Sequence, residues 1–350
     1  MRVLQCIWRM HIGGTEGQIV RLAPGLKRHG VDVHVVTALP GDYDSLLATE
    51  VHRIRSLFKY DASPLLQLIA LCRRLRPDVI HTFLTQMDIF GGTAASLLRI
   101  PWVLSERSVS SAYPPTPRHR VRAIVGRRAD AIVANSADGA DYWRAVAPAV
   151  RIRVIPNSVP QNAIDAAEPV DDPRLGEMIL YVGRFSAEKN LFVLLEALEP
   201  VLRHRNASAV FAGDGVLRSD VERKARELGL SERTRFLGNV TDVWSWLKRA
   251  SVVVAVSTFE GNPNAVLEAA AAGIPLVLSD IPGHRAVFNE DAAWYVDGGS
   301  PHSISSGIDH VLQNRSEAAA RALCARQAIG SRSEDEVAAQ YEQVYREVIG

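Results

Sequence analysis

Cysteine is scarce in this chain, and long apolar runs are missing from it. Among 350 residues there are three cysteines, Cys6, Cys72 and Cys324, which have neither the spacing of a metal site nor a disulfide framework. We therefore expect a reducing, cytoplasmic environment. Apolar stretches fall short of the roughly 20 residues that a membrane-spanning helix needs. The first residues, 1–8, predict a strand and are too soon interrupted by Arg9 and His11 for a signal peptide.

Several functional signatures are also missing. No Gly-x-Gly-x-x-Gly follows a predicted strand, which disfavours an NAD-linked dehydrogenase. Zinc-finger spacing, a helix-turn-helix pattern and interleaved aromatic and basic RNA-binding motifs are absent too, so we expect no nucleic acid as a partner.

The net charge of +1 conceals an asymmetry between the two halves of the chain. Residues 1–160 contain 21 Lys+Arg and 12 Asp+Glu, a net of +9, and the remainder contains 40−21=19 and 39−12=27, a net of −8. A basic half attracts anionic partners such as an acidic glycan, a lipid diphosphate or an anionic membrane surface. An arginine-rich surface that is only solvated is the alternative.

Strands and helices alternate along the chain. Strands are predicted at residues 2–8, 31–38, 79–82, 102–105 and 131–134, and helices at 18–29, 64–75, 87–98 and 118–128. The same alternation returns after residue 177, and 350 residues exceed what one core usually serves. The pattern therefore predicts two α/β domains with doubly wound parallel sheets. Residues 161–176, polar and rich in Pro and Ala, are expected to be a linker.

Two glutamates frame the stretch around which the second half is organised. A predicted strand, residues 251–256, runs into a polar loop that contains Glu260, and Pro263 is expected at the first position of a helix that carries Glu268 and ends at Gly273. Both carboxylates face the region beyond a strand's carboxyl end, where a helix N-terminus favours an anion such as phosphate. The alternative is that neither glutamate binds a ligand: Glu260 would be only a charge that the helix dipole favours, and Glu268 a solvated residue of the helix.

This stretch resembles the E-x7-E element of the family 4 glycosyltransferases, which have the GT-B fold. The segments Gly183-Arg-Phe-Ser-Ala-Glu-Lys-Asn190 and Ile155-Pro-Asn157 are similar to two further motifs of that family. The resemblance implies two Rossmann-like domains with a cleft between them. It implies an acceptor-binding domain of residues 1–157, completed by a terminal helix at 333–350, and a donor-binding domain of residues 158–332.

The resemblance also implies a reaction. A sugar would pass from a nucleotide diphosphate, UDP or GDP, to a glycan or lipid-linked acceptor with retention of configuration, in polysaccharide, lipopolysaccharide or glycolipid synthesis. No metal and no cofactor are implied, because Arg184 and Lys189 would stabilise the leaving diphosphate. The protein would be cytoplasmic. A peripheral position on the inner face of the plasma membrane is a second expectation that is compatible with this location. The competing hypothesis is an inactive regulatory protein that binds a sugar nucleotide.

The matching motifs assign residues to roles. Glu260, Arg184 and Lys189 would be catalytic. The donor would contact the following residues: Gly14, Gly183, Arg184, Lys189, Gly213, Asn239, Val240, Glu260, Gly261, Asn264, Ala265, Val266, Leu267 and Glu268.

The acceptor is assigned to the first domain. The Gly13-Gly14 turn and Glu16 match the family's glycine loop, and His81 follows a predicted strand, where a structural role is the alternative. Many relatives carry a histidine in the loop after the strand at 102–105, where this chain has Glu106 and Arg107. These two residues would contact the acceptor or pair with each other.

Overall fold

Two compact units make up the chain, and the computed structural model describes residues 1–56, 61–113 and 115–350. Unit 1 consists of Met1–Ser158 and Arg332–Gly350, and unit 2 of Val159–Ser331. In both, short runs rich in Val, Ile and Ala form the central strands, which are buried on both faces, as in other parallel sheets.

Unit 1 is built on a seven-stranded parallel sheet of order β3-β2-β1-β4-β5-β6-β7. Its strands are β1 (Arg2–Cys6), β2 (Asp32–Thr37), β3 (Glu50–Arg53), β4 (Val79–Phe83), β5 (Trp102–Glu106), β6 (Ala131–Ala134) and β7 (Arg151–Val154). Its helices are α1 (Gly14–Arg28), α2 (Ser63–Leu75), α3 (Leu84–Leu98), α4 (Pro117–Gly126), α5 (Ala137–Val146) and α14 (Glu334–Ile349).

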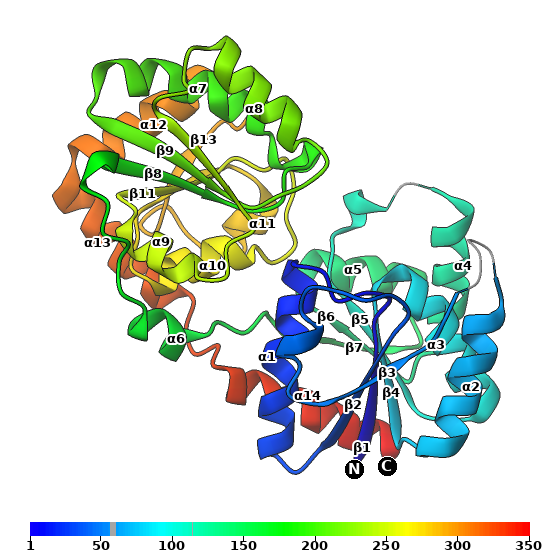
Figure 1. Ribbon diagram of the computed structural model, residues 1–350. Coiled ribbons are helices and arrows are strands. Elements are labelled where there is room, and N and C mark those ends of the chain that lie inside the picture. The colour runs from blue at the N-terminus through cyan, green and yellow to red at the C-terminus, as the bar shows by residue number, and fades with distance from the viewer. Residues whose placement is uncertain (57–60, 114) are drawn as a thin grey trace. The chain divides into compact units, whose positions relative to one another are not determined.

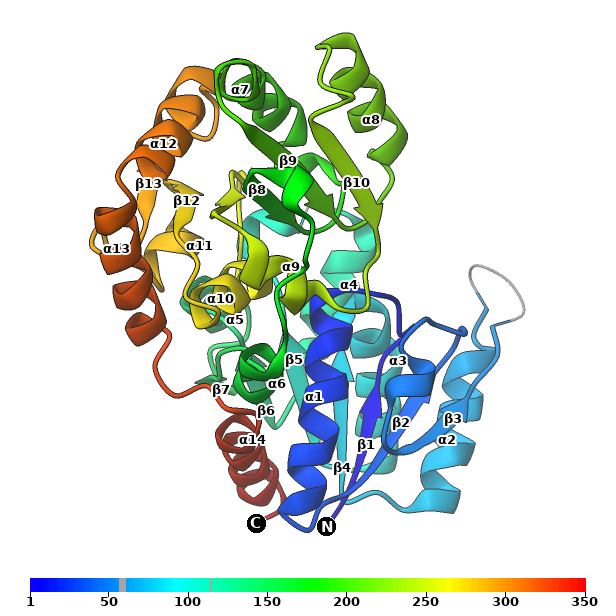
Figure 2. The same ribbon diagram turned by 60° about the vertical axis from the view of Figure 1, so that its left-hand side comes forward.

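Helices cover both faces of this sheet. The helices α1 and α14 lie side by side on one face, and α2 and α3 cover the other (Figures 1 and 2). Ser333 caps α14 through a reciprocal capping box with Glu336. The helix after β1 begins at Gly14, four residues earlier than its hydrophobic pattern indicates.

Unit 2 has a six-stranded parallel sheet of order β10-β9-β8-β11-β12-β13. Its strands are β8 (Glu177–Val182), β9 (Ala207–Ala212), β10 (Thr234–Gly238), β11 (Val252–Ala255), β12 (Leu276–Ser279) and β13 (Trp294–Val296). Its helices are α6 (Gln161–Ala166), α7 (Leu191–His204), α8 (Arg218–Glu227), α9 (Val243–Arg249), α10 (Asn264–Ala271), α11 (Pro282–Arg285), α12 (Pro301–Gln313) and α13 (Arg315–Ala328).

The expectation that residues 161–176 form a linker is wrong. They contain α6 and a short 3-10 turn, Pro173–Leu175. Ile164 is fully buried and Leu175 is 3% exposed, and both belong to the core that α9, α10 and α13 share with the sheet of unit 2. Polar contacts attach the stretch as well: Arg235 donates to Asp172 and the amide of Val170 donates to the carbonyl of Ser245.

None of the helices in the described part of the chain is both long and apolar enough to cross a membrane.

Candidate functional site

The candidate site lies at the carboxyl ends of the strands of unit 2. The strand order places β8 beside β11, and from there the chain continues outward to β9 on one side and to β12 on the other. In open α/β sheets, ligands bind beyond the carboxyl ends of the strands at such a switch point. The loops that follow β8 and β11 therefore carry the side chains that matter most.

Lys189 and Glu260 join these two loops. The ammonium Nζ of Lys189 is paired with Oε1 of Glu260, and the hydroxyl of Ser257 donates to the same oxygen over 2.7 Å. The amide of Thr258 donates to the carbonyl of Glu188 over 2.8 Å. The side chains of Lys189 and Glu260 are 20% and 15% exposed, so the pair is accessible yet held in place.

Local backbone geometry explains this placement. Asn190 has φ 56°, in the left-handed region, and its side-chain amide donates to the carbonyl of Gly298 over 2.6 Å as the chain turns into α7. Gly283 lies against the Glu260 loop, where a Cβ would come within 2.2 Å of the Glu260 carbonyl oxygen. Burial lowers the pKa of His284, whose Nδ1 lies 2.9 Å from the Ser279 carbonyl oxygen, so its ring stays neutral.

Three glycines bring the ends of neighbouring strands together. The amide of Gly213 donates to the carbonyl of Gly238 over 2.8 Å, and the amide of Gly183 donates to that of Ala212 over 3.0 Å. Gly213 has φ 141°, and a Cβ there would lie 1.9 Å from the Gly183 carbonyl oxygen. A side chain is therefore excluded at Gly213, and the backbone itself forms the surface at these strand ends.

Glu268 lies on α10, and its side chain is nearly buried. The residue is 8% exposed, and the indole of Trp244 donates to its Oε2 over 3.4 Å. Pro263 is the N-cap of α10 and not its first helical residue, which corrects the sequence prediction.

The remaining donor candidates divide by exposure. Val266 and Leu267 are buried in the core of unit 2, so a ligand would meet their backbone only. Asn264, Ala265, Gly261 and Val240 are half-buried, and Asn239 is exposed. Arg184 is exposed as well, while its carbonyl accepts a hydrogen bond from the hydroxyl of Tyr181 over 2.8 Å.

In unit 1 the glycine turn caps α1. Gly13 is the N-cap and Gly14, which is exposed, is the first helical residue; Glu16 is 8% exposed in the first turn. These residues lie beyond β1 at the switch point of the first sheet, between β1 and β4.

His81 and Glu106 do not lie where an acceptor could touch them. Both are fully buried. The ring nitrogens of His81 are each 2.7 Å from a hydroxyl, that of Tyr345 at Nδ1 and that of Ser105 at Nε2. Burial lowers the pKa of His81 strongly, so its ring is neutral. The expectation of an acceptor contact is therefore corrected to a structural role for both residues.

Glu106 belongs to a buried polar cluster that sequence analysis missed. It accepts from Arg122 Nη1 over 2.9 Å, from the Trp143 indole over 2.8 Å and from the Tyr113 hydroxyl over 2.5 Å. Arg122 also donates to Asp88 Oδ2 over 2.7 Å. Arg122, on a helix whose other arginines, Arg118 and Arg120, are exposed, is thus an internal ion-pair partner.

Arg107 points away from this cluster and does not pair with Glu106. Its Nη2 donates to Asn157 Oδ1 over 2.7 Å and its Nη1 to the Tyr341 hydroxyl over 3.3 Å, so it connects the segment after β7 with helix α14 within unit 1.

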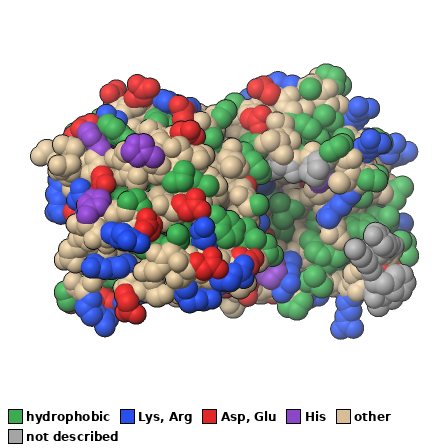
Figure 3. Space-filling view, turned by 90° about the horizontal axis from the view of Figure 1, so that it is seen from above, with side chains coloured by type: hydrophobic (Ala, Val, Ile, Leu, Met, Phe, Trp, Pro, Cys, Tyr) green, Lys and Arg blue, Asp and Glu red, His purple; other side chains and the backbone are tan. Residues whose placement is uncertain are grey.

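The exposed side of α4 combines charge with apolar surface. Arg118 and Arg120 are exposed, and so are Val121 and Ile124, at 44% and 62%. Figure 3 shows basic side chains beside hydrophobic ones along the right-hand edge, whereas basic and acidic ones are interspersed over the left-hand part.

Comparison with known proteins gives a consistent result for both units. Residues 169–328 match the family model described as Glycosyl transferases group 1, and residues 12–162 match that of Glycosyltransferase Family 4. An uncharacterized glycosyltransferase of Methanocaldococcus jannaschii is 26% identical over 350 residues, covering 90% of each chain.

Two further similarities concern a named enzyme and a solved structure. The GalNAc-alpha-(1->4)-GalNAc-alpha-(1->3)-diNAcBac-PP-undecaprenol alpha-1,4-N-acetyl-D-galactosaminyltransferase of Campylobacter jejuni is 28% identical, covering 77% of this chain and 76% of its own. Anabaena HepE, solved in complex with UDP-glucose, superposes with a TM-score of 0.87 at 18% identity, over 99% of this chain and 100% of its own. The GT-B fold is confirmed. With its two units matching the two family models, the chain belongs to the family 4 glycosyltransferases.

Proposed function

We propose that this glycosyltransferase moves a hexose from a nucleotide-diphosphate sugar to a glycan or lipid-linked acceptor, with retention of configuration, in cell-surface polysaccharide or glycolipid synthesis. The observation that carries the proposal is the Lys189–Glu260 pair at the switch point of unit 2. The lipid-linked saccharide in the name of the Campylobacter jejuni relative supports the acceptor class. The UDP-glucose held by Anabaena HepE supports UDP over GDP as the nucleotide.

The donor would lie across the carboxyl ends of β8, β9, β10 and β11. The diphosphate would meet Lys189 and Arg184, and the base would meet the backbone near Asn239 and Val240, beside the glycine surface of Gly183 and Gly213. Glu268 would accept ribose hydroxyls, and the amides at residues 264–267 of α10 would add partial positive charge.

Charge stabilisation is the chemistry these residues can supply. An ammonium group has three N–H donors, so Lys189 can hold Glu260 and still donate to a diphosphate oxygen. As the bond between the anomeric carbon and the diphosphate oxygen breaks, its electron pair moves onto the diphosphate, which Lys189 and Arg184 stabilise. The acceptor oxygen then attacks from the same face and passes its proton to the departing phosphate. This route needs neither a protein nucleophile nor a metal at the donor.

Unit 1 would hold the acceptor, with Gly13 and Glu16 as its candidate contacts. The exposed side of α4 would meet an anionic membrane surface through Arg118 and Arg120, with Val121 and Ile124 entering the interface. Arg122 is excluded from this role because it is buried against Asp88 and Glu106. A peripheral position on the inner face of the plasma membrane would follow.

Turnover of the donor tests the proposal directly. Incubation with UDP-hexoses and GDP-hexoses should release nucleotide slowly by hydrolysis and faster with a polyprenyl-diphosphate saccharide, and release should persist in EDTA. Sugar-nucleotide binding without any release would instead establish the competing hypothesis of an inactive regulatory protein. Activity lost in EDTA and restored by magnesium or manganese would contradict the metal-independent mechanism.

Vesicle binding tests the membrane surface separately. Replacing Arg118, Arg120, Arg127 and Arg128 with Gln should abolish binding to anionic vesicles at low salt and leave UDP affinity unchanged. Equal binding of the wild-type protein to neutral vesicles would contradict an electrostatic attachment.

A further inference from the structure

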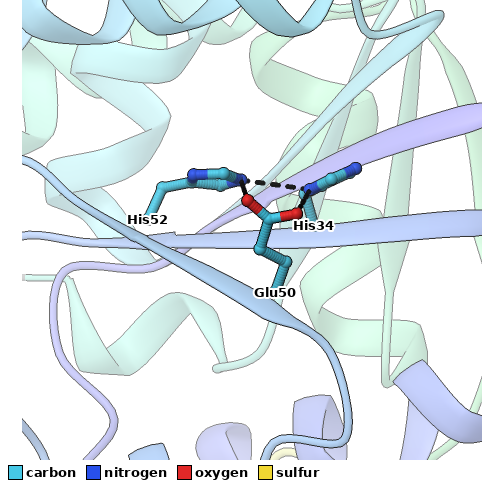
Figure 4. A group of neighbouring side chains, drawn as sticks. All are labelled: His34, Glu50 and His52. Atoms are coloured by element: carbon cyan, nitrogen blue, oxygen red, sulfur yellow. Dashed lines mark hydrogen bonds and ion pairs between the residues drawn. The ribbon is translucent and has the colours of Figure 1, made fainter.

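Two histidines and a glutamate converge on the edge of the sheet of unit 1, remote from the donor residues of unit 2 in the chain. His34 lies on β2, and Glu50 and His52 lie on the neighbouring edge strand β3. The parallel register pairs His34 with Glu50 and Val36 with His52. Because alternate residues of a strand share a face, all three side chains project from the same side of the sheet, as Figure 4 shows.

We propose that His34 Nδ1, His52 Nε2 and the Glu50 carboxylate form a binding site for a divalent transition metal such as Zn²⁺ or Co²⁺. The two ring nitrogens are 3.0 Å apart; His34 Nδ1 lies 3.6 Å from Oε2 of Glu50, and His52 Nε2 lies 3.6 Å from Oε1. Bonds of 2.0–2.1 Å at tetrahedral angles place ligand atoms about 3.3–3.4 Å from one another. The separations between the ring nitrogens and the carboxylate oxygens are close to that value.

A carboxylate behind His34 favours this orientation of the ring. Nε2 of His34 lies 3.4 Å from Oδ1 of Asp32, and Oδ2 of Asp32 accepts from Nε of Arg2 over 2.7 Å. Nε2 of His34 makes no hydrogen bond to the residues that the structure describes, and the Asp32 carboxylate is an acceptor within reach of it. A hydrogen bond formed there would leave the lone pair of Nδ1 facing His52 and Glu50, as outer carboxylates do for metal-bound histidines.

Burial and access also fit a metal site. His34 and His52 are 7% and 9% exposed, whereas the side chain of Glu50 is 66% exposed. The two imidazoles thus provide a rigid half of the site, and the glutamate closes it from the solvent side, where water can occupy a fourth position. Arg74 is a nearby positive charge that would repel a bound cation, since it acts electrostatically on His52.

The expected role is structural, because the metal would tie the edge strand β3 to β2. The site lies on the edge strand β3 and its neighbour β2, and β2 separates β3 from β1, the strand that the turn at Gly13 and Gly14 follows. The site therefore does not conflict with a metal-independent transfer reaction, and it rests on none of the residues proposed for the donor.

Cobalt spectroscopy tests the proposal. The untagged full-length protein, stripped with EDTA and dialysed, is titrated with CoCl₂ while the visible d–d absorption of tetrahedral Co²⁺ is recorded. We expect saturation at one equivalent, displacement by Zn²⁺ and a rise in the unfolding temperature. Asp32→Asn, which removes the positioning carboxylate, should weaken binding about 10–100-fold.

Matched variants decide the assignment. Glu50→Gln, at an exposed position that tolerates the change, and His52→Gln should each lower cobalt affinity by at least about tenfold, whereas His302→Gln, at an exposed histidine of unit 2, should not. A wild-type protein without saturable cobalt absorption would show that the two rings are hydrogen-bonded to each other and bind no metal. Equal binding by wild type, Glu50→Gln and His52→Gln would also overturn the site.

Discussion

Lys189 and Glu260 are separated by 71 positions in the chain, and their ammonium and carboxylate groups form an ion pair at the junction of the loops after β8 and β11. The pair holds the Lys189 ammonium at the carboxyl ends of the strands of unit 2, and at those strand ends the backbones of Gly213 and Gly183 approach too closely for a side chain. Four predictions follow from this and from the buried polar groups of unit 1.

Lys189→Ala should weaken binding of UDP about tenfold to a hundredfold. The reason is that a hydrogen bond between charged groups contributes roughly 1.5–3 kcal/mol. Isothermal titration calorimetry measures the change. Lys224→Ala provides the control, because Lys224 forms an ion pair with Glu196 on the surface of the same unit. An equal loss in the control would remove Lys189 from the donor site.

The two glutamates should differ in what they affect. Glu268→Ala is expected to weaken UDP about tenfold to a hundredfold, because a carboxylate that accepts ribose hydroxyls acts on the bare nucleotide. Glu260→Ala should leave UDP affinity undiminished, because it releases Lys189 from a competing carboxylate. It should lower kcat, because Glu260 would contact only the sugar, where charge develops during transfer. Calorimetry with UDP and steady-state kinetics distinguish the two. If both variants lose nucleotide affinity equally, this division of roles is wrong.

Arg122→Met should destabilise unit 1 by about 3–5 kcal/mol, because it leaves the buried carboxylates of Asp88 and Glu106 without their partner. Urea unfolding followed by circular dichroism measures the loss. Adding Asp88→Asn and Glu106→Gln should recover part of it by removing the unpaired charges. Arg120→Met, at an exposed position of the same helix, is the control. An equally large loss of stability in this variant would mean that the effect comes from changing helix α4 and not from the buried ion pairs.

Acidification should reveal the buried histidine His81. Its folded-state pKa lies well below 6.5, so the unfolded chain takes up the proton first as the pH falls. The associated stability is complete above pH 6.5 and is lost as the pH drops toward the folded pKa, at up to about 1.4 kcal/mol per pH unit. His81→Gln should flatten this slope in urea unfolding between pH 7 and 5, whereas His302→Gln should not. An unchanged slope in His81→Gln would contradict the assignment.

Local sequence patterns predicted most of the architecture. Apolar periodicity and glycine positions identified strand and helix alternation, because buried parallel strands and amphipathic helices each leave a period in the sequence. Elements without such a period could not be predicted from the sequence. The short α6 depends on one buried side chain, Ile164, and edge strand β3 consists of Glu50-Val-His-Arg53, which has little apolar character.

The sequence by itself determined the family, the GT-B fold and the motif residues Lys189, Glu260 and Glu268, because these lie in contiguous segments with characteristic spacing. Only the tertiary structure decided which charged residues are paired and which are buried. Glu106 and Arg122 look like surface charges in the sequence, yet they are buried together, since strand β5 and helix α4 meet through long-range contacts. His34 and His52 likewise become neighbours through the register of β2 and β3, and register between strands is set by the packing of the whole sheet.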